Sequence, residues 1–375
     1  MTAAPNPGSK RRSTPRFAAL RRLLRGAIVL AIAAGVLAWD LDRQLDQPLA
    51  LQQAATFEIA PGSGLNRIVT AAREQGLFAS ARQSAYLAIY ARFSGQAGRI
   101  KAGEYRLEPG LTPRTLLQLW DSGKTVLHEL RLIEGWRFAD ALKTVRQSPD
   151  LTQTLDAAAT PADAMRALGR DGQAPEGLLF PDTYRFQKGM TDVAFLRNAI
   201  AEQERVLGEE WAKRAPNLPY DSPQQALTMA SIIEKETGTA AERAEIAGVF
   251  VRRLRLGMRL QTDPTVIYGI GEAYDGNIRS RDLLADTPYN TYTRDGLPPT
   301  PICLAGREAI RAALQPADGN ALYFVARGDG SHQFSATLDE HNAAVQRFQL
   351  RSGRSSTAAP AASGTRPGAA ARRLR

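Results

Sequence analysis

The hydrophobic and polar positions of the first 150 residues follow three successive patterns. Residues 26–39 form a run without charged side chains. Residues 41–53 are polar and amphipathic, which predicts a linker or a helix beside a membrane. From residue 56 onward, strict alternation and helical spacing take turns. These patterns predict strands at 57–61, 103–107 and 126–133, and helices at 64–75, 80–93, 112–122 and 136–146.

The second half of the chain carries longer helical patterns. Residues 151–172 are rich in alanine and are predicted to be helical, and a dense apolar block follows at 176–186. The most clearly marked helix has Ser222 as its N-cap and ends at Gly238. Its apolar positions recur at helical spacing and predict one buried face, formed by Ala226, Met229, Ala230, Ile232 and Ile233.

Two glutamates stand near the end of this helix. Glu234 and Glu236 fall on opposite flanks of the apolar sector, while Lys235 shares the polar face with Thr228 and Ser231. A carboxyl group at the margin of an apolar face loses water, which favours its protonated form and suits it to donate a proton near neutral pH. Helical geometry does not choose between the two glutamates, and a merely solvated helix end is the alternative interpretation.

A second capping box, Thr239 with Glu242, predicts that another helix begins there and ends at Gly257. Its buried stripe is expected at Ile246, Ala247, Phe250, Val251 and Leu254. The arginines of the same helix are expected on a solvated face, with Arg253 on its flank.

The net charge of +10 comes from the two ends of the chain. Residues 1–25 carry seven Lys and Arg and no acidic side chain, and residues 351–375 carry six Arg and no acidic side chain. The remaining residues hold 35 basic and 38 acidic side chains, a net charge of −3. This distribution argues against a nucleic-acid-binding groove on the folded part. Residues 351–375 lack periodicity and are predicted to be a disordered basic tail.

The apolar run at 26–39 is flanked by arginines before it and by Asp40 and Asp42 after it. Because arginines can snorkel, we expect an uncleaved transmembrane helix at 20–39, preceded by a basic cytoplasmic tail at 1–19. The positive flank predicts that everything after about residue 40 lies outside the cytoplasm. A signal peptide cleaved after a small residue such as Ala38 is the alternative, and the size of the mature protein distinguishes the two.

Cysteine and histidine usage limits the possible chemistry. Cys303 is the only cysteine, so neither an intramolecular disulfide nor a cysteine-based metal cluster is possible. His332 and His341 are nine residues apart without a metal-binding motif, and no serine-hydrolase elbow surrounds Ser331. We therefore expect neither a metal nor another cofactor.

Five blocks of sequence, in this order and spacing, resemble the endolytic murein transglycosylase family of bacterial cell-wall enzymes. The first is Glu-Gly-Leu-Leu-Phe-Pro-Asp-Thr-Tyr at 176–184, and the second is Ala-Ser-Ile-Ile-Glu-Lys-Glu-Thr at 230–237. The other three lie at 260–269, at 289–292 leading to 296–299, and at 330–334 leading to 340–342. The resemblance implies that the first Glu of the Glu-Lys-Glu run, Glu234, is the catalytic acid and base.

The resemblance also implies an α+β fold with one N-terminal transmembrane helix. After a linker at 40–55, it implies a small LysM-like β-α-α-β subdomain at 56–150 and a mixed α+β catalytic domain at 151–350.

Loops rich in amide, hydroxyl and aromatic side chains can match the hydroxyl groups and flat faces of sugars. Together with the family blocks, this chemistry predicts the substrate-binding residues, which are Gln261, Thr262, Asp263, Tyr268, Tyr289, Asn290, Thr291, Tyr292, His332, His341 and Asn342. Ordinary turn chemistry is the alternative for each residue taken alone.

The activity implied is endolytic cleavage of the MurNAc-GlcNAc β-1,4 bond within peptidoglycan glycan strands. The product ends are 1,6-anhydroMurNAc, and termination of growing strands is the expected role. The location implied is the bacterial inner membrane, with the catalytic domain in the periplasm and peptidoglycan synthases as partners. Two alternatives stay open. One is a two-carboxylate hydrolase that uses Asp263, and the other is an inactive glycan-binding scaffold that recruits synthases.

Overall fold

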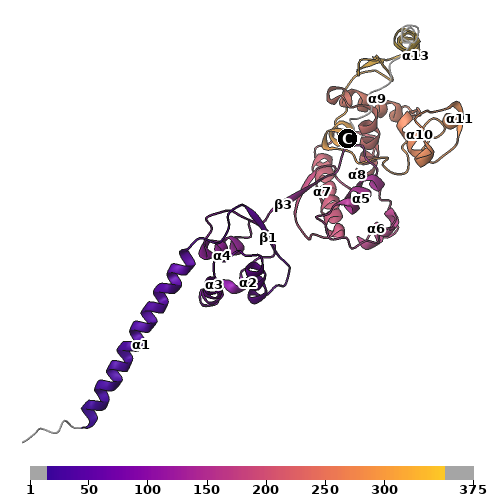
Figure 1. Ribbon diagram of the computed structural model, residues 1–375. Helices are drawn as coiled ribbons and strands as arrows, with labels where there is room; N and C mark the ends of the chain where they lie inside the picture. Colours follow the sequence, from indigo (N-terminus) through magenta and orange to yellow (C-terminus); the bar gives the residue numbers. More distant parts are fainter. Residues whose placement is uncertain (1–14, 351–375) are drawn as a thin grey trace, which may run out of the picture. The chain divides into compact units, whose positions relative to one another are not determined.

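Residues 15–350 are described by a computed structural model of the chain (Figure 1). The predicted tail at 351–375 and most of the basic tail at 1–19 lie outside these residues. The chain divides into two units. Unit 1 holds the described residues up to His128 together with Phe186–Gly189, and unit 2 holds Glu129–Arg185 and the described residues from Met190 onward.

Unit 1 begins with α1, a continuous helix at Pro15–Asp46 (Figure 1). Its segment Leu20–Asp46 is long and apolar enough to cross a membrane. The helix continues past the apolar run because its last turns pack on the rest of unit 1. Leu45 is fully buried there, and the Arg114 guanidinium pairs with Asp46 at 2.8 Å.

The rest of unit 1 is a small α+β module. Its elements are β1 (Ala55–Ile59), α2 (Leu65–Glu74), α3 (Ala81–Phe93), η1 (Gln96–Gly98), β2 (Gly103–Leu107) and α4 (Pro113–Ser122). β1 and β2 pair antiparallel, with Phe57 opposite Tyr105. Phe57 stacks on Trp120 with ring centroids 5.6 Å apart, and both side chains are buried. The order β1-α2-α3-β2 is β-α-α-β, while the likeness of this region to LysM modules stays a prediction.

Unit 2 is mainly helical, and the chain passes between the units within β3, within β4 and after Gly189. The elements up to the long helices are β3 (Leu127–Arg131), α5 (Phe138–Gln147), α6 (Pro161–Ala167), β4 (Thr183–Gln187), α7 (Asp192–Ala212) and α8 (Pro223–Glu236). The later elements are η2 (Ala240–Glu242), α9 (Arg243–Arg255), α10 (Asp263–Ile270), η3 (Gly271–Ala273), α11 (Ser280–Leu284), α12 (Arg307–Leu314), β5 (Tyr323–Ala326), β6 (His332–Ser335), α13 (Leu338–Val345) and the π-helical turn η4 (Gln346–Leu350). The sheets are the pairs β1-β2, β3-β4 and β5-β6, so the predicted mixed α+β class is confirmed.

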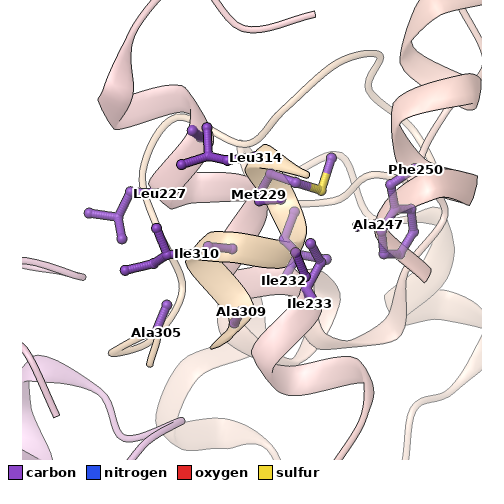
Figure 2. Packing of buried hydrophobic residues seen from close by; sticks show 14 of the residues in the cluster. Leu227, Met229, Ile232, Ile233, Ala247, Phe250, Ala305, Ala309, Ile310 and Leu314 are labelled. Atoms are coloured by element: carbon purple, nitrogen blue, oxygen red, sulfur yellow. The ribbon is translucent and has the colours of Figure 1, made fainter. Parts of the chain in front are cut away.

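The core of unit 2 forms where α8, α9 and α12 pack together (Figure 2). Ser222 caps α8 as predicted, because its side chain accepts a hydrogen bond from the Gln225 backbone N–H. The prediction of one buried face is wrong in extent, since Thr228 and Ser231 are buried as well. The Ser231 hydroxyl is satisfied internally, because it donates to the Thr228 carbonyl at 2.7 Å and accepts from the Ile302 N–H at 2.9 Å. α8 is therefore buried along residues 226–233 and reaches solvent at its first and last turns.

Candidate active site

A cavity of about 460 Å³ lies in unit 2 beside the last turn of α8. Its walls come from α9, the segment that leads into α10, the hairpin β5-β6 and α13. The residues that line it are Glu236, Arg253, Leu260, Gln261, Thr262, Asp263, Tyr292, Tyr323, Phe324, Val325, Ala326, His332, Leu338, His341, Val345 and Gln349. Six of the predicted substrate-binding residues are among them, namely Gln261, Thr262, Asp263, Tyr292, His332 and His341.

Glu236 is the carboxyl group that α8 delivers to this cavity. The helix ends at Glu236 because the next residue, Thr237, has an extended backbone. Burial raises the pKa of Glu236 to about 7. A hydrogen bond from the Thr262 hydroxyl and the charges of His332 and Arg253 oppose this effect, whereas the charge of Asp263 adds to it. Near neutral pH this carboxyl group is therefore present in both protonated and ionised forms.

Glu234 lies on the other flank of α8 and does not belong to the cavity wall. Its Oε2 accepts from the Gly306 N–H at 3.0 Å, and its Oε1 accepts from the Arg243 guanidinium at 3.4 Å. Its side chain is only 6% exposed. Burial raises the pKa of Glu234 as well, and the charge of Glu134 adds to this. Both of its carboxyl oxygens are thus engaged by the protein itself.

The segment before α10 presents three polar side chains to the cavity. Gln261 has a left-handed backbone with φ 50°, an uncommon conformation for a residue other than glycine. Its backbone N–H donates to the Thr291 carbonyl at 3.1 Å. Asp263 begins α10 and accepts a hydrogen bond of 2.6 Å from the Tyr292 hydroxyl. This second carboxylate therefore stands beside Glu236 with one oxygen already partnered.

The two predicted histidines come from the C-terminal elements of unit 2. His332 begins β6, and Glu242 holds it through two hydrogen bonds. His341 lies on α13 and stacks on Tyr323 with ring centroids 5.3 Å apart. Burial lowers the pKa of His341, which favours its neutral form. Asn342 follows it on α13 but is exposed and does not line the cavity.

Four other predicted residues have partners within the protein and lie outside the cavity wall. The Asn290 amide donates to three backbone carbonyls and closes its own turn. Thr291 is buried and shares a hydrogen bond of 2.8 Å with Thr265. Tyr268 donates to Glu176 at 3.1 Å, and its ring lies 4.7 Å from that of Tyr289. These residues support the loops that carry the cavity wall.

Arg253 and Tyr323 also line the cavity, and neither was predicted to do so. Arg253, expected on the flank of a solvated face, is only 8% exposed. Its guanidinium donates to the carbonyls of Leu322 and Leu260, at 2.7 Å and 2.8 Å. It also lies over the Tyr323 ring at 5.2 Å. No local motif indicates either residue, because the contacts of Arg253 with Leu322 and Tyr323 join segments about 70 residues apart.

The second capping box is also wrong. Thr239 makes no capping bond with its side chain, and its hydroxyl donates to the Gly330 carbonyl at 3.0 Å instead. The Glu242 carboxylate likewise makes its hydrogen bonds with His332 instead of capping the helix. The short helix η2 precedes α9, so both side chains face the β5-β6 hairpin rather than the helix end.

These features define a class of site. Within residues 15–350, no group of three or more His, Cys, Asp or Glu side chains is placed to hold a metal ion. The cavity instead offers one carboxyl group with a pKa near neutrality, a second carboxylate and several hydroxyl, amide and aromatic groups. Such an arrangement suits general acid and base catalysis on a polar, hydroxyl-rich ligand.

Comparisons with known proteins show the family of the chain. A model of the YceG-like family matches residues 57–347. The endolytic murein transglycosylase of Bacillus subtilis is 30% identical over 308 residues, which cover 78% of this chain and 84% of that protein. The protein of the same name from Streptococcus pneumoniae D39 is 27% identical, covering 80% of this chain and 60% of that protein. The chain belongs to the YceG-like family.

A solved structure has also been compared with the chain. The crystal structure of a putative yceG-like protein from Listeria monocytogenes is 30% identical in sequence. The alignment covers 78% of this chain and 99% of that one, with a TM-score of 0.49.

Proposed function

We propose that this chain is an endolytic murein transglycosylase, a lyase that cuts within the glycan strands of peptidoglycan. Family membership supports the activity, because both named relatives are endolytic murein transglycosylases. The observation that carries the assignment to a site is the position of Glu236. It lies on the wall of a polar cavity, and its pKa is about 7.

The chemistry needs one group that first gives a proton and then takes one. Protonated Glu236 would donate its proton to the glycosidic oxygen as the bond from that oxygen to C1 of MurNAc breaks. The ionised carboxylate would then remove the proton from the 6-hydroxyl of the same MurNAc while that oxygen attacks C1. A 1,6-anhydro ring forms, no water is consumed, and Glu236 is protonated again. A pKa near 7 suits both halves of this cycle.

The two glutamates of the Glu-Lys-Glu run are rival candidates for this role. The family resemblance implies Glu234, whereas the geometry supports Glu236. Glu234 is held by the Gly306 N–H and by Arg243, away from the cavity wall. Glu236 shares the cavity with Gln261 and Tyr292, which have the chemistry to bind a sugar. We therefore assign catalysis to Glu236 and a supporting role to Glu234.

The remaining residues of the wall would bind the glycan. Gln261, Thr262 and Asp263 offer an amide, a hydroxyl and a carboxylate along one edge. Tyr292 and the two histidines offer rings and further polar atoms along the others. Arg253 supplies a buried positive charge near the reacting carboxyl group.

The proposed location is the inner membrane. The α1 helix would be an uncleaved single-pass anchor, with its basic flank in the cytoplasm and the cavity of unit 2 in the periplasm. Cutting strands close to the membrane would suit the termination of glycan chains as they are made. Peptidoglycan synthases are the proposed partners for that role.

The test is digestion of isolated peptidoglycan by the full chain in detergent, with mass spectrometry of the released fragments. We expect 1,6-anhydroMurNAc ends that are absent when Glu236→Gln is used. Reducing MurNAc ends would instead support a hydrolase in which Asp263 is the second carboxylate. Strands that bind but are never shortened would support the scaffold alternative.

A further inference from the structure

Both carboxylate oxygens of Glu242 contact His332, which lies 90 residues later in the sequence. One carboxylate oxygen of Glu242 accepts from the His332 backbone N–H at 2.9 Å, and the other lies 2.7 Å from Nδ1 of the ring. The two side chains are 14% and 13% exposed, so the pair is largely shielded from water. The contact joins η2, just after α8, to the first residue of β6.

The chemistry of this contact fixes the ring. Burial works to raise the pKa of Glu242, but the hydrogen bonds from the His332 ring and backbone outweigh it and hold that pKa below its usual value. An ionised carboxylate can only accept hydrogen bonds, so Nδ1 must carry the hydrogen atom. When the ring is neutral, Nε2 then carries a free lone pair. No residue in the described part of the chain forms a hydrogen bond with this Nε2.

The ring also stands where a ligand would meet it. His332 lines the same cavity as Glu236. The Phe324 ring meets the imidazole edge to face at 5.4 Å and limits its rotation. The ring is thus held by a carboxylate at one nitrogen and by an aromatic neighbour on its side.

We infer that Glu242 is a positioning residue that holds His332 in its Nδ1-protonated form, so that Nε2 accepts a hydrogen bond from a hydroxyl or amide N–H of the bound glycan. The identity of the ligand rests on the proposed function. The protonation of Nδ1 does not, because it follows from the contact with the Glu242 carboxylate alone. This is the arrangement in which a buried carboxylate sets the tautomer of a histidine that acts on the ligand.

The first test reads the ring directly. The sequence contains three histidines, so the full chain labelled with ¹⁵N-histidine gives a simple spectrum, and His332→Ala identifies the signal of interest. We expect Nδ1 of His332 to be protonated in the wild type and the proton to move to Nε2 in part of the molecules of Glu242→Gln. An unchanged tautomer in that variant overturns the inference. This readout needs no turnover, so it stands apart from the test of the activity.

The second test is a double-mutant cycle in the digestion of glycan strands. Because a positioning residue acts only through its partner, Glu242→Ala and His332→Ala should each lower kcat/KM by roughly 10- to 100-fold. The double variant should be no worse than the poorer single variant. Glu242→Gln should retain intermediate activity, and it serves as the readout if the alanine variant folds poorly. Losses that multiply in the double variant overturn the inference.

The matched control is Glu245→Ala. Glu245 lies on α9, three residues after Glu242, and is exposed. Its replacement should leave both the His332 tautomer and kcat/KM at the wild-type value. If Glu245→Ala lowers kcat/KM as much as Glu242→Ala does, the effect belongs to the charge of this region and the proposed pairing is refuted. If the wild type cuts no strands while the tautomer depends on Glu242, the proposed function fails and the ring assignment survives.

Discussion

Replacing Glu236 by Gln is expected to make unit 2 more stable at alkaline pH. In the folded protein, burial raises the pKa of Glu236 from 4.5 to about 7. At pH values below 4.5 the carboxyl group is protonated in both the folded and the unfolded chain, so its ionisation affects stability little. Between 4.5 and 7 the unfolded chain releases the proton and the folded one keeps it. The folded state therefore loses stability as the pH rises through this window.

The size of this loss follows from the two pKa values. Each pKa unit corresponds to about 1.4 kcal/mol, so the full loss is on the order of 3 kcal/mol above pH 7. Gln cannot ionise, and its side-chain oxygen can still accept the hydrogen bond from the Thr262 hydroxyl. The stability of Glu236→Gln relative to the wild type should thus increase by about 3 kcal/mol between pH 4.5 and pH 8.

The assay is urea unfolding of the full chain at pH 4.5, 6, 7 and 8. Hydrogen exchange of peptides from α8 follows the transition, so that unit 2 is measured separately from unit 1. Glu245→Gln, at an exposed position, should follow the wild type at every pH. If the wild type and Glu236→Gln lose stability in parallel over this range, then Glu236 is not a buried carboxyl group with a raised pKa, and the reasoning is refuted.

Four further predictions address the pH profile and the packing of unit 2. If protonated Glu236 is the acid, kcat/KM on glycan strands should fall about tenfold per pH unit above pH 7, and a rate that stays level to pH 9 would contradict this. Ser231→Ala leaves the buried Ile302 N–H without a partner and should lower the free energy of unfolding by about 1–3 kcal/mol in urea unfolding. Gly248→Ala should destabilise the chain, because the new Cβ would lie 2.5 Å from a backbone carbonyl oxygen. Gly208→Ala, whose Cβ meets nothing within 4 Å, should raise the melting temperature through helix propensity.

Local signals in the sequence predict much of the fold. The N-cap at Ser222 follows from a side chain and a backbone N–H three residues away, and the structure has it. The predicted strand at 103–107 matches β2, because alternation with one buried face is also a local pattern. The strand predicted at 126–133 is shorter in the structure, at Leu127–Arg131. Such signals are reliable where neighbouring residues decide the structure.

Contacts between distant segments decide the rest, and the sequence pattern does not carry them. Glu242 has the spacing of a capping residue, yet its carboxylate bonds to His332, 90 residues away. Arg253 is predicted on the flank of a solvated face, yet it is buried and bonds to the carbonyl of Leu322, 69 residues away. Asn290 has an amide side chain that could bind a sugar, but this amide donates to a backbone carbonyl of its own turn. The choice between the two glutamates depends on which flank of α8 meets the β5-β6 hairpin, which also requires the tertiary structure.

The most direct test of the account compares Glu236→Gln with Glu234→Gln, both as the full chain in detergent with purified glycan strands. The measured quantity is the rate at which 1,6-anhydroMurNAc ends appear, with binding of the strands measured in parallel. General acid and base catalysis contributes on the order of 10²–10⁴-fold, so Glu236→Gln should lose at least about a hundredfold in rate while it still binds. Glu234→Gln should retain a substantial share of the wild-type rate. The opposite order, with Glu236→Gln active and Glu234→Gln inactive but folded, would contradict the assignment of the cavity as the catalytic site.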